Sequence, residues 1–168
     1  GRCYQELGRF DQALGCYREL MDLPDSVETR SIRSKSTRQA MECWTQETVK
    51  KYQAAIERGE RWQKERGGQP TDTDDLAIRY LTAVAYQEQA KALPEKDPNR
   101  KRLSGAAKEL VQPVARHPGE FQRPAKTLLV ALQDKGAKDA AETKGAPTNF
   151  AEAFEQGQTA LGQMQDAA

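Results

Sequence analysis

Residues 1–24, GRCYQELGRFDQALGCYRELMDLP, decide the fold because they contain two short apolar patterns with helical spacing. In the first pattern, Tyr4 and Leu7 lie three residues apart and share one face of a helix. Gly8 ends that helix. The second pattern places apolar residues every three or four positions, at Phe10, Ala13, Leu14, Tyr17 and Leu20. Pro24 ends this second helix, so the stretch predicts two antiparallel helices joined by a tight turn.

The same residues, read as G-x-x-Y-x-x-x-G-x-F-D-x-A-x-x-x-Y, resemble the last two-thirds of a tetratricopeptide (TPR) repeat. The resemblance implies that the packing positions of the two helices and their turn are Gly1, Tyr4, Gly8, Phe10, Ala13 and Tyr17. Leu20 departs from the alanine usual in the family, and Pro24 comes one residue early. Because the first part of the repeat is missing, we expect this chain to be a fragment of a longer one.

The spacing of the second helix recurs three times along the chain. The matching positions are Tyr52, Ala55 and Gly59, then Leu103 and Ala106, then Phe150, Ala153 and Gly157. The middle recurrence also fits a register one residue later, with Ala107, Val111 and Val114, and both registers stay open. The intervals between positions 10, 52, 103 and 150 are 42, 51 and 47 residues. A standard TPR repeats every ~34 residues, so longer helices or connections are expected here.

Each recurring helix has an upstream partner with its own apolar stripe, and no segment shows a convincing alternation typical of a strand. The fold class we predict is all-α, with about eight helices in antiparallel pairs stacked as a TPR-like right-handed α-solenoid segment. One domain would cover residues 1–168, with repeat units at approximately 1–25, 27–67, 72–118 and 120–167. The small residues listed above would lie where two helices approach each other closely.

Composition excludes several classes of protein. The formal net charge is only +1, so no global field attracts nucleic acid or an anionic membrane. No apolar run approaches the ~20 residues that span a bilayer. The chain has an odd number of cysteines, Cys3, Cys16 and Cys43, and no two of them form a CxxC motif. We therefore expect them to be small buried apolar side chains and not parts of disulfides or of a zinc site.

Candidate chemistry is sparse. His117 is the only histidine and follows a predicted helix, where its ring is expected to bond the last carbonyls. No nucleophile–base arrangement, phosphate-binding glycine motif or metal-ligand spacing is recognisable. We therefore predict a protein that is not an enzyme and holds no cofactor and no metal.

In TPR proteins, the resemblance implies, the first helix of each pair lines a concave groove that holds a peptide or a partner helix. Matching the aligned positions places Trp44, Tyr80 and Gln87 in this groove. Trp and Tyr are favoured anchors at interfaces. The alternative is that Trp44 belongs to the core between repeats.

The function we expect is a non-catalytic interaction or scaffold module of a larger TPR protein, with a protein or peptide partner and no membrane span in this segment. Two alternatives stay open. One is a helical accessory or spacer domain of an enzyme or envelope-associated protein. The other is an RNA- or anion-binding repeat that uses the basic stretches TRSIRSKSTR and NRKRL, although nucleic acid is not the partner we favour. For the compartment, a soluble cytoplasmic segment is favoured over an exported part of a larger chain.

Overall fold

A computed structural model describes residues 1–66 and 72–143, and every regular element in this part of the chain is an α-helix. The all-α prediction is therefore confirmed for the described residues. The chain divides into two compact units, residues 1–129 and 130–168, and the second is described only over residues 130–143. The helices are α1 (Arg2–Glu6), α2 (Phe10–Met21), α3 (Val27–Thr45), α4 (Tyr52–Glu65), α5 (Thr73–Ala92), α6 (Pro98–Arg116) and α7 (Gln122–Thr143).

Local sequence explains where several helices begin. The Ser26 hydroxyl accepts a hydrogen bond from the Thr29 backbone at 3.2 Å, and the Thr29 side chain bonds back to Ser26, which forms a capping box. The Asp72 carboxylate caps α5 by accepting from the Asp75 amide at 2.8 Å. Gly8 takes a φ of +70° in the turn between α1 and α2, a backbone conformation that suits glycine.

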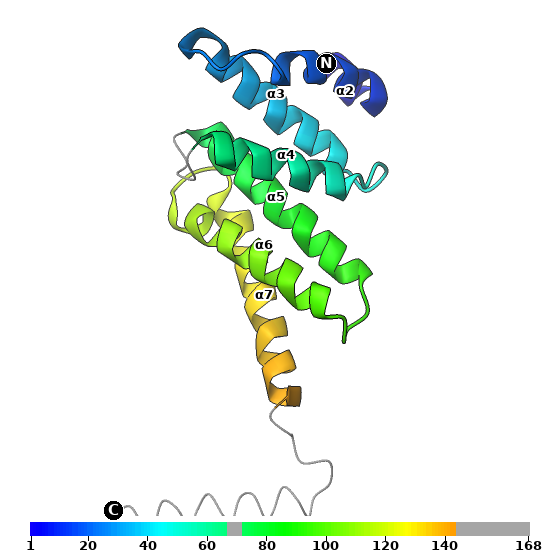
Figure 1. Cartoon of the computed structure of the whole chain (residues 1–168), viewed down its shortest axis with the longest axis vertical. Coiled ribbons are helices and arrows are strands. Elements are labelled where there is room, and N and C mark those ends of the chain that lie inside the picture. The colour runs from blue at the N-terminus through cyan, green and yellow to red at the C-terminus, as the bar shows by residue number, and fades with distance from the viewer. Residues whose placement is uncertain (67–71, 144–168) are drawn as a thin grey trace, which may run out of the picture. The chain divides into compact units, whose positions relative to one another are not determined.

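Helices α2 to α6 run in alternating directions, each beside the one before it (Figure 1). Helix α3 packs on α2, α4 and α5, and α5 also packs on α4 and α6. The helices that pack on each other are adjacent along the chain or, in the case of α3 and α5, separated by one helix. Helix α1 packs on α2.

Two hydrophobic clusters stabilise the packing of α2, α3, α4 and α5. One joins α2 to α3 and contains Ala13, Leu14, Tyr17, Met21, Ala40 and Cys43. The other joins α3, α4 and α5 and contains Met41, Ala55, Ile56, Trp62, Ile78, Leu81 and Ala85. Trp44 packs against both clusters, so this side chain links them across α3.

Four of the small residues singled out in the sequence lie in close helix contacts. Ala13 and Ala55 are fully buried. A Cβ atom at Gly59 would lie 2.0 Å from the Thr82 hydroxyl oxygen, and one at Gly1 would lie 2.3 Å from the Tyr17 ring. These positions leave no room for a larger side chain.

The other packing positions are less enclosed. Phe10 and Tyr52 are half-buried beside the clusters, whereas Tyr4 is exposed. On α6 the later register holds: Ala107, Val111 and Val114 are buried, while Leu103 and Ala106 are only half-buried. Phe150, Ala153 and Gly157 lie outside the described residues.

The prediction of three buried cysteines is wrong for two of them. Cys3 and Cys16 are exposed because they lie on the outer faces of α1 and α2, and only Cys43 is buried. Burial raises the pKa of the Cys43 thiol to about 11. None of the described helices is long and apolar enough to cross a lipid bilayer.

A candidate polar binding groove

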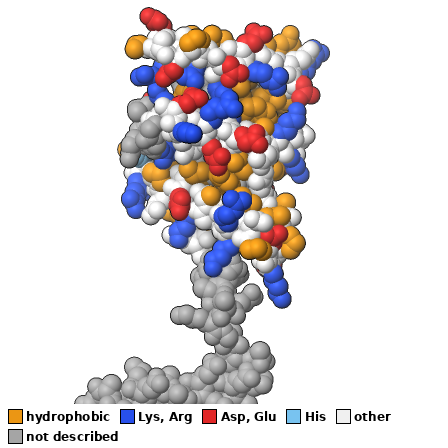
Figure 2. Space-filling view, viewed as in Figure 1, with side chains coloured by type: hydrophobic (Ala, Val, Ile, Leu, Met, Phe, Trp, Pro, Cys, Tyr) orange, Lys and Arg blue, Asp and Glu red, His pale blue; other side chains and the backbone are white. Residues whose placement is uncertain are grey.

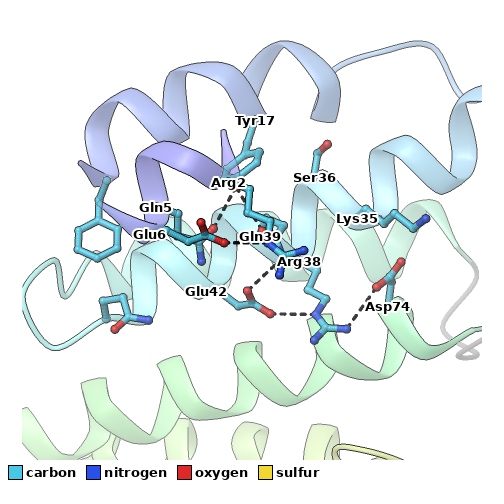
Figure 3. Close-up of a pocket in the computed structure, with 12 residues that line it drawn as sticks. Arg2, Gln5, Glu6, Tyr17, Lys35, Ser36, Arg38, Gln39, Glu42 and Asp74 are labelled. Carbon is cyan, nitrogen blue, oxygen red and sulfur yellow. Dashed lines mark hydrogen bonds and ion pairs between the residues drawn. The ribbon is translucent and has the colours of Figure 1, made fainter. Parts of the chain in front are cut away.

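A cavity of about 850 Å³ lies in the first unit along α1 and α3 (Figure 3). Its walls combine three amides, both signs of charge and two aromatic rings. The lining residues are Arg2, Gln5, Glu6, Phe10, Tyr17, Lys35, Ser36, Arg38, Gln39, Glu42, Gln46 and Asp74. Five of them lie between Lys35 and Glu42 on one side of α3, and Gln46 follows as the C-cap of this helix.

Tyr17 lies at the back of this groove and organises two of the amides. Its hydroxyl lies 3.0 Å from Oε1 of Gln5 and 3.2 Å from Oε1 of Gln39. Figure 3 shows these side chains together in the groove. The Gln39 amide donates to Glu42 at 3.3 Å, which extends the chain of polar contacts along α3. Burial raises the pKa of Tyr17 to about 12, so the phenol stays protonated and neutral at physiological pH.

Arg38 is the most connected charge in the groove. Its guanidinium bonds Glu42 at 2.9 Å on the same helix and lies 3.6 Å from Asp74 at the start of α5. It also reaches Glu120 at 3.3 Å, in the connection between α6 and α7. The Arg38 side chain is only 21% exposed, so these partners stabilise a charge that is largely withdrawn from solvent.

Other groups at the groove have hydrogen-bonding capacity to spare. Lys35 and Gln46 are exposed, and their side chains make no ion pair or hydrogen bond within the described part of the chain. Lys35 offers a cationic donor, and the Gln46 amide offers both donors and an acceptor. These donors and this acceptor are therefore not used by contacts within the described residues.

Trp44, Tyr80 and Gln87 were expected in a TPR-type concave groove, and their assignment to such a groove stays a prediction. Trp44 is half-buried between the two hydrophobic clusters. Tyr80 is half-buried on α5 with its ring centroid 5.6 Å from that of Phe121. Gln87 is buried, and its side-chain oxygen has no hydrogen-bond partner among the described residues. None of the three lines the cavity.

The polar residues that line this cavity are not among those predicted from the sequence. A usable signal exists in the sequence: Lys35, Arg38, Gln39 and Glu42 share one polar face of α3, and Gln46 directly follows this helix. Their tertiary partners, such as the carboxylate at Glu120, come from distant parts of the chain. Helical periodicity carries no information about those partners.

Ion pairs occupy the principal arginines of the first basic stretch. Arg33 is buried and bonds Asp25 at 2.9 Å and Glu65 at 2.8 Å. Arg38 has the carboxylate partners described above. The charges of Arg33 and Arg38 are thus already paired with carboxylates and are less available to phosphate groups. This pairing weakens the nucleic-acid alternative. Figure 2 shows positive and negative side chains interspersed over the visible face, with no extended region of one sign.

His117 lies at the end of α6, where its Nδ1 is 2.9 Å from the Pro113 carbonyl oxygen. This is the helix-end contact that the sequence predicts. Within residues 1–66 and 72–143, no three His, Cys, Asp or Glu side chains are grouped so as to hold a metal ion.

Comparison with known proteins adds no family assignment, since no protein-family model, curated protein or solved structure matches this chain.

Proposed function

We propose that this chain is a TPR-like interaction module whose polar groove binds an extended segment of a partner protein. Two features support a TPR-like arrangement: the residue pattern of positions 1–24 and the succession of helix pairs α1–α2, α3–α4 and α5–α6. The groove lies along α1 and α3 and reaches the start of α5. These are the first helices of the three pairs, which are the helices expected to face a partner.

The proposal depends on one observation, the cavity of about 850 Å³ with its amide-rich polar wall. An extended peptide exposes a backbone donor and acceptor at almost every residue. The side chains of Gln5, Gln39 and Gln46 supply both kinds of group, and Lys35 adds a charge at the edge. A wall of this chemistry suits a polar segment better than an apolar helix, which would leave these groups without partners.

A peptide display library, selected on the full chain and analysed by titration calorimetry, tests the proposal. The groove variants are Lys35→Glu and Gln46→Ala, because both residues are exposed and neither has contacts that hold the fold. The matched controls are Lys64→Glu on α4 and Gln112→Ala on α6, which are also exposed. All four variants should keep the helical circular dichroism signal of the parent.

We expect selected peptides to lose about tenfold or more in affinity with the groove variants and to keep it with the controls. An equal effect of Lys35→Glu and Lys64→Glu would indicate general electrostatics instead of a site. A selection that yields only ligands indifferent to Lys35 and Gln46 would refute the assignment of the groove.

A further inference from the structure

The connection between α6 and α7 contributes a contact to the end of the groove. It comprises residues 117–121, HPGEF, and Gly119 in its centre has a φ of +148°, a region that favours glycine. After this glycine the next two side chains both meet Arg38. The Glu120 carboxylate lies 3.3 Å from the guanidinium, and the guanidinium carbon lies 5.0 Å from the centre of the Phe121 ring.

These two contacts combine in one short sequence the groups that a guanidinium prefers. A carboxylate accepts charge-assisted hydrogen bonds in the plane of the guanidinium, and an aromatic ring packs against its face. The turn holds both on consecutive residues of the chain. Tyr80 lies beside the same ring, at 5.6 Å between centroids, and so extends the aromatic surface next to Arg38.

The contact with the turn is the outermost of the Arg38 interactions. Glu42 and Asp74 lie on α3 and α5 and are about one-quarter and one-fifth exposed. Glu120 is 62% exposed, so water competes for its carboxylate. An incoming carboxylate can therefore replace Glu120 while Glu42 and Asp74 continue to neutralise Arg38.

We propose that the 117–121 turn occupies, within the chain itself, the site on Arg38 that a partner segment would bind. The groove would then recognise a segment in which an acidic residue directly precedes an aromatic one. The inference rests on the proposed function and names the chemistry of its ligand. The partner's carboxylate and ring displace Glu120 and Phe121 from Arg38. The rest of the segment extends along the wall toward Gln39 and Gln46.

Competition by the turn sets the size of the expected effect. A part-exposed ion pair together with a cation–π contact corresponds to about five- to thirtyfold in an equilibrium constant. Weakening the turn's hold on Arg38 should strengthen binding of an external ligand by a similar factor, because the binding-competent state becomes more populated.

The probe is a fluorescent peptide with the sequence of residues 117–123, HPGEFQR, capped at both ends and followed by fluorescence anisotropy. The released protein is the full chain with Glu120→Gln and Phe121→Leu, which preserve the approximate size of both side chains. The control peptide carries the same two replacements. Arg38→Lys in the released protein keeps the positive charge but removes the planar guanidinium.

We expect the released protein to bind the probe about tenfold more tightly than the parent does, and the control peptide to bind neither. Arg38→Lys should abolish the gain while circular dichroism shows a folded chain. Equal binding of the probe to parent and released protein would overturn the inference, as would equal binding of probe and control peptide. If display-selected ligands depend on Lys35 and Gln46 but do not compete with the probe, the inference fails while the proposed function stands.

Discussion

Replacing Gly59 with alanine tests the closest contact between α4 and α5. A Cβ atom at this position would lie 2.0 Å from Oγ1, 2.9 Å from Cγ2 and 3.0 Å from Cβ of Thr82. Thr82 is fully buried and its hydroxyl donates to the Ile78 carbonyl at 2.7 Å. Rotation of this β-branched side chain would sacrifice the hydrogen bond, so the two helices must move apart instead.

The expected magnitude is the difference between two opposing effects. Overpacking of a close-packed contact costs about 1–3 kcal/mol. Alanine recovers about 1 kcal/mol relative to glycine in a helix interior. The overpacking term is the larger one here because three heavy atoms of Thr82 crowd the new methyl group. Gly59→Ala should therefore lower the free energy of unfolding by about 1–2 kcal/mol.

Urea denaturation followed by circular dichroism measures this change as a lower midpoint at constant slope. Gly105→Ala on α6 is the matched control, because a Cβ there meets no atom within 4 Å and only the helix-propensity gain remains. It should raise the free energy of unfolding by up to about 1 kcal/mol. Combining Gly59→Ala with Thr82→Ala should restore part of the lost stability. If Gly59→Ala stabilises the chain as Gly105→Ala does, the close contact of α4 with α5 is wrong.

Three further predictions concern the same unit. Ala55→Trp should destabilise by several kcal/mol more than Gln53→Trp, since Ala55 is fully buried and Gln53 is exposed; equal denaturation midpoints would show that the buried face of α4 is misassigned. Trp62→Phe removes the indole donor 2.7 Å from the buried Asp75 carboxylate and should cost about 1–3 kcal/mol in thermal unfolding, whereas an unchanged melting temperature would contradict this bond. The pKa of Tyr17 is raised from 10.0 to about 12 in the folded state, so its contribution to the free energy of unfolding is complete below pH 10 and is lost as the pH rises through 12. Tyr17→Phe should therefore make the free energy of unfolding fall less steeply between pH 10 and 12. Identical pH profiles of the parent and the variant would refute the assignment.

Much of the helical architecture could be predicted from the sequence, because helix periodicity and capping are local properties. Ser26 and Asp72 form the caps that begin α3 and α5, and buried alanines mark the contacts of α2 and α4. The register of α6 required the structure. Residues 106 and 107 are both alanine, and only packing against α5 distinguishes them.

The groove was less accessible to sequence analysis. Alignment with the repeat pattern placed Trp44 either in a TPR-type concave groove or in the core, and in the structure its side chain packs between two hydrophobic clusters. In a sequence pattern, a large aromatic residue on an amphipathic helix fits a groove position and a core position equally well. The contact of Arg38 with Glu120 joins positions 82 residues apart, and such ion pairs follow from the packing of the helices alone.

The order of contacts in the first unit also has a kinetic consequence. Its extensive helix contacts join elements that are adjacent or one element apart along the described chain. Chains dominated by such short-range contacts close only small loops as they fold, and domains of this kind reach the native state in microseconds to milliseconds. Assembly can thus begin at any hairpin and spread to its neighbours. The bridge from Arg38 to the distant turn would form last, after the intervening helices are in place.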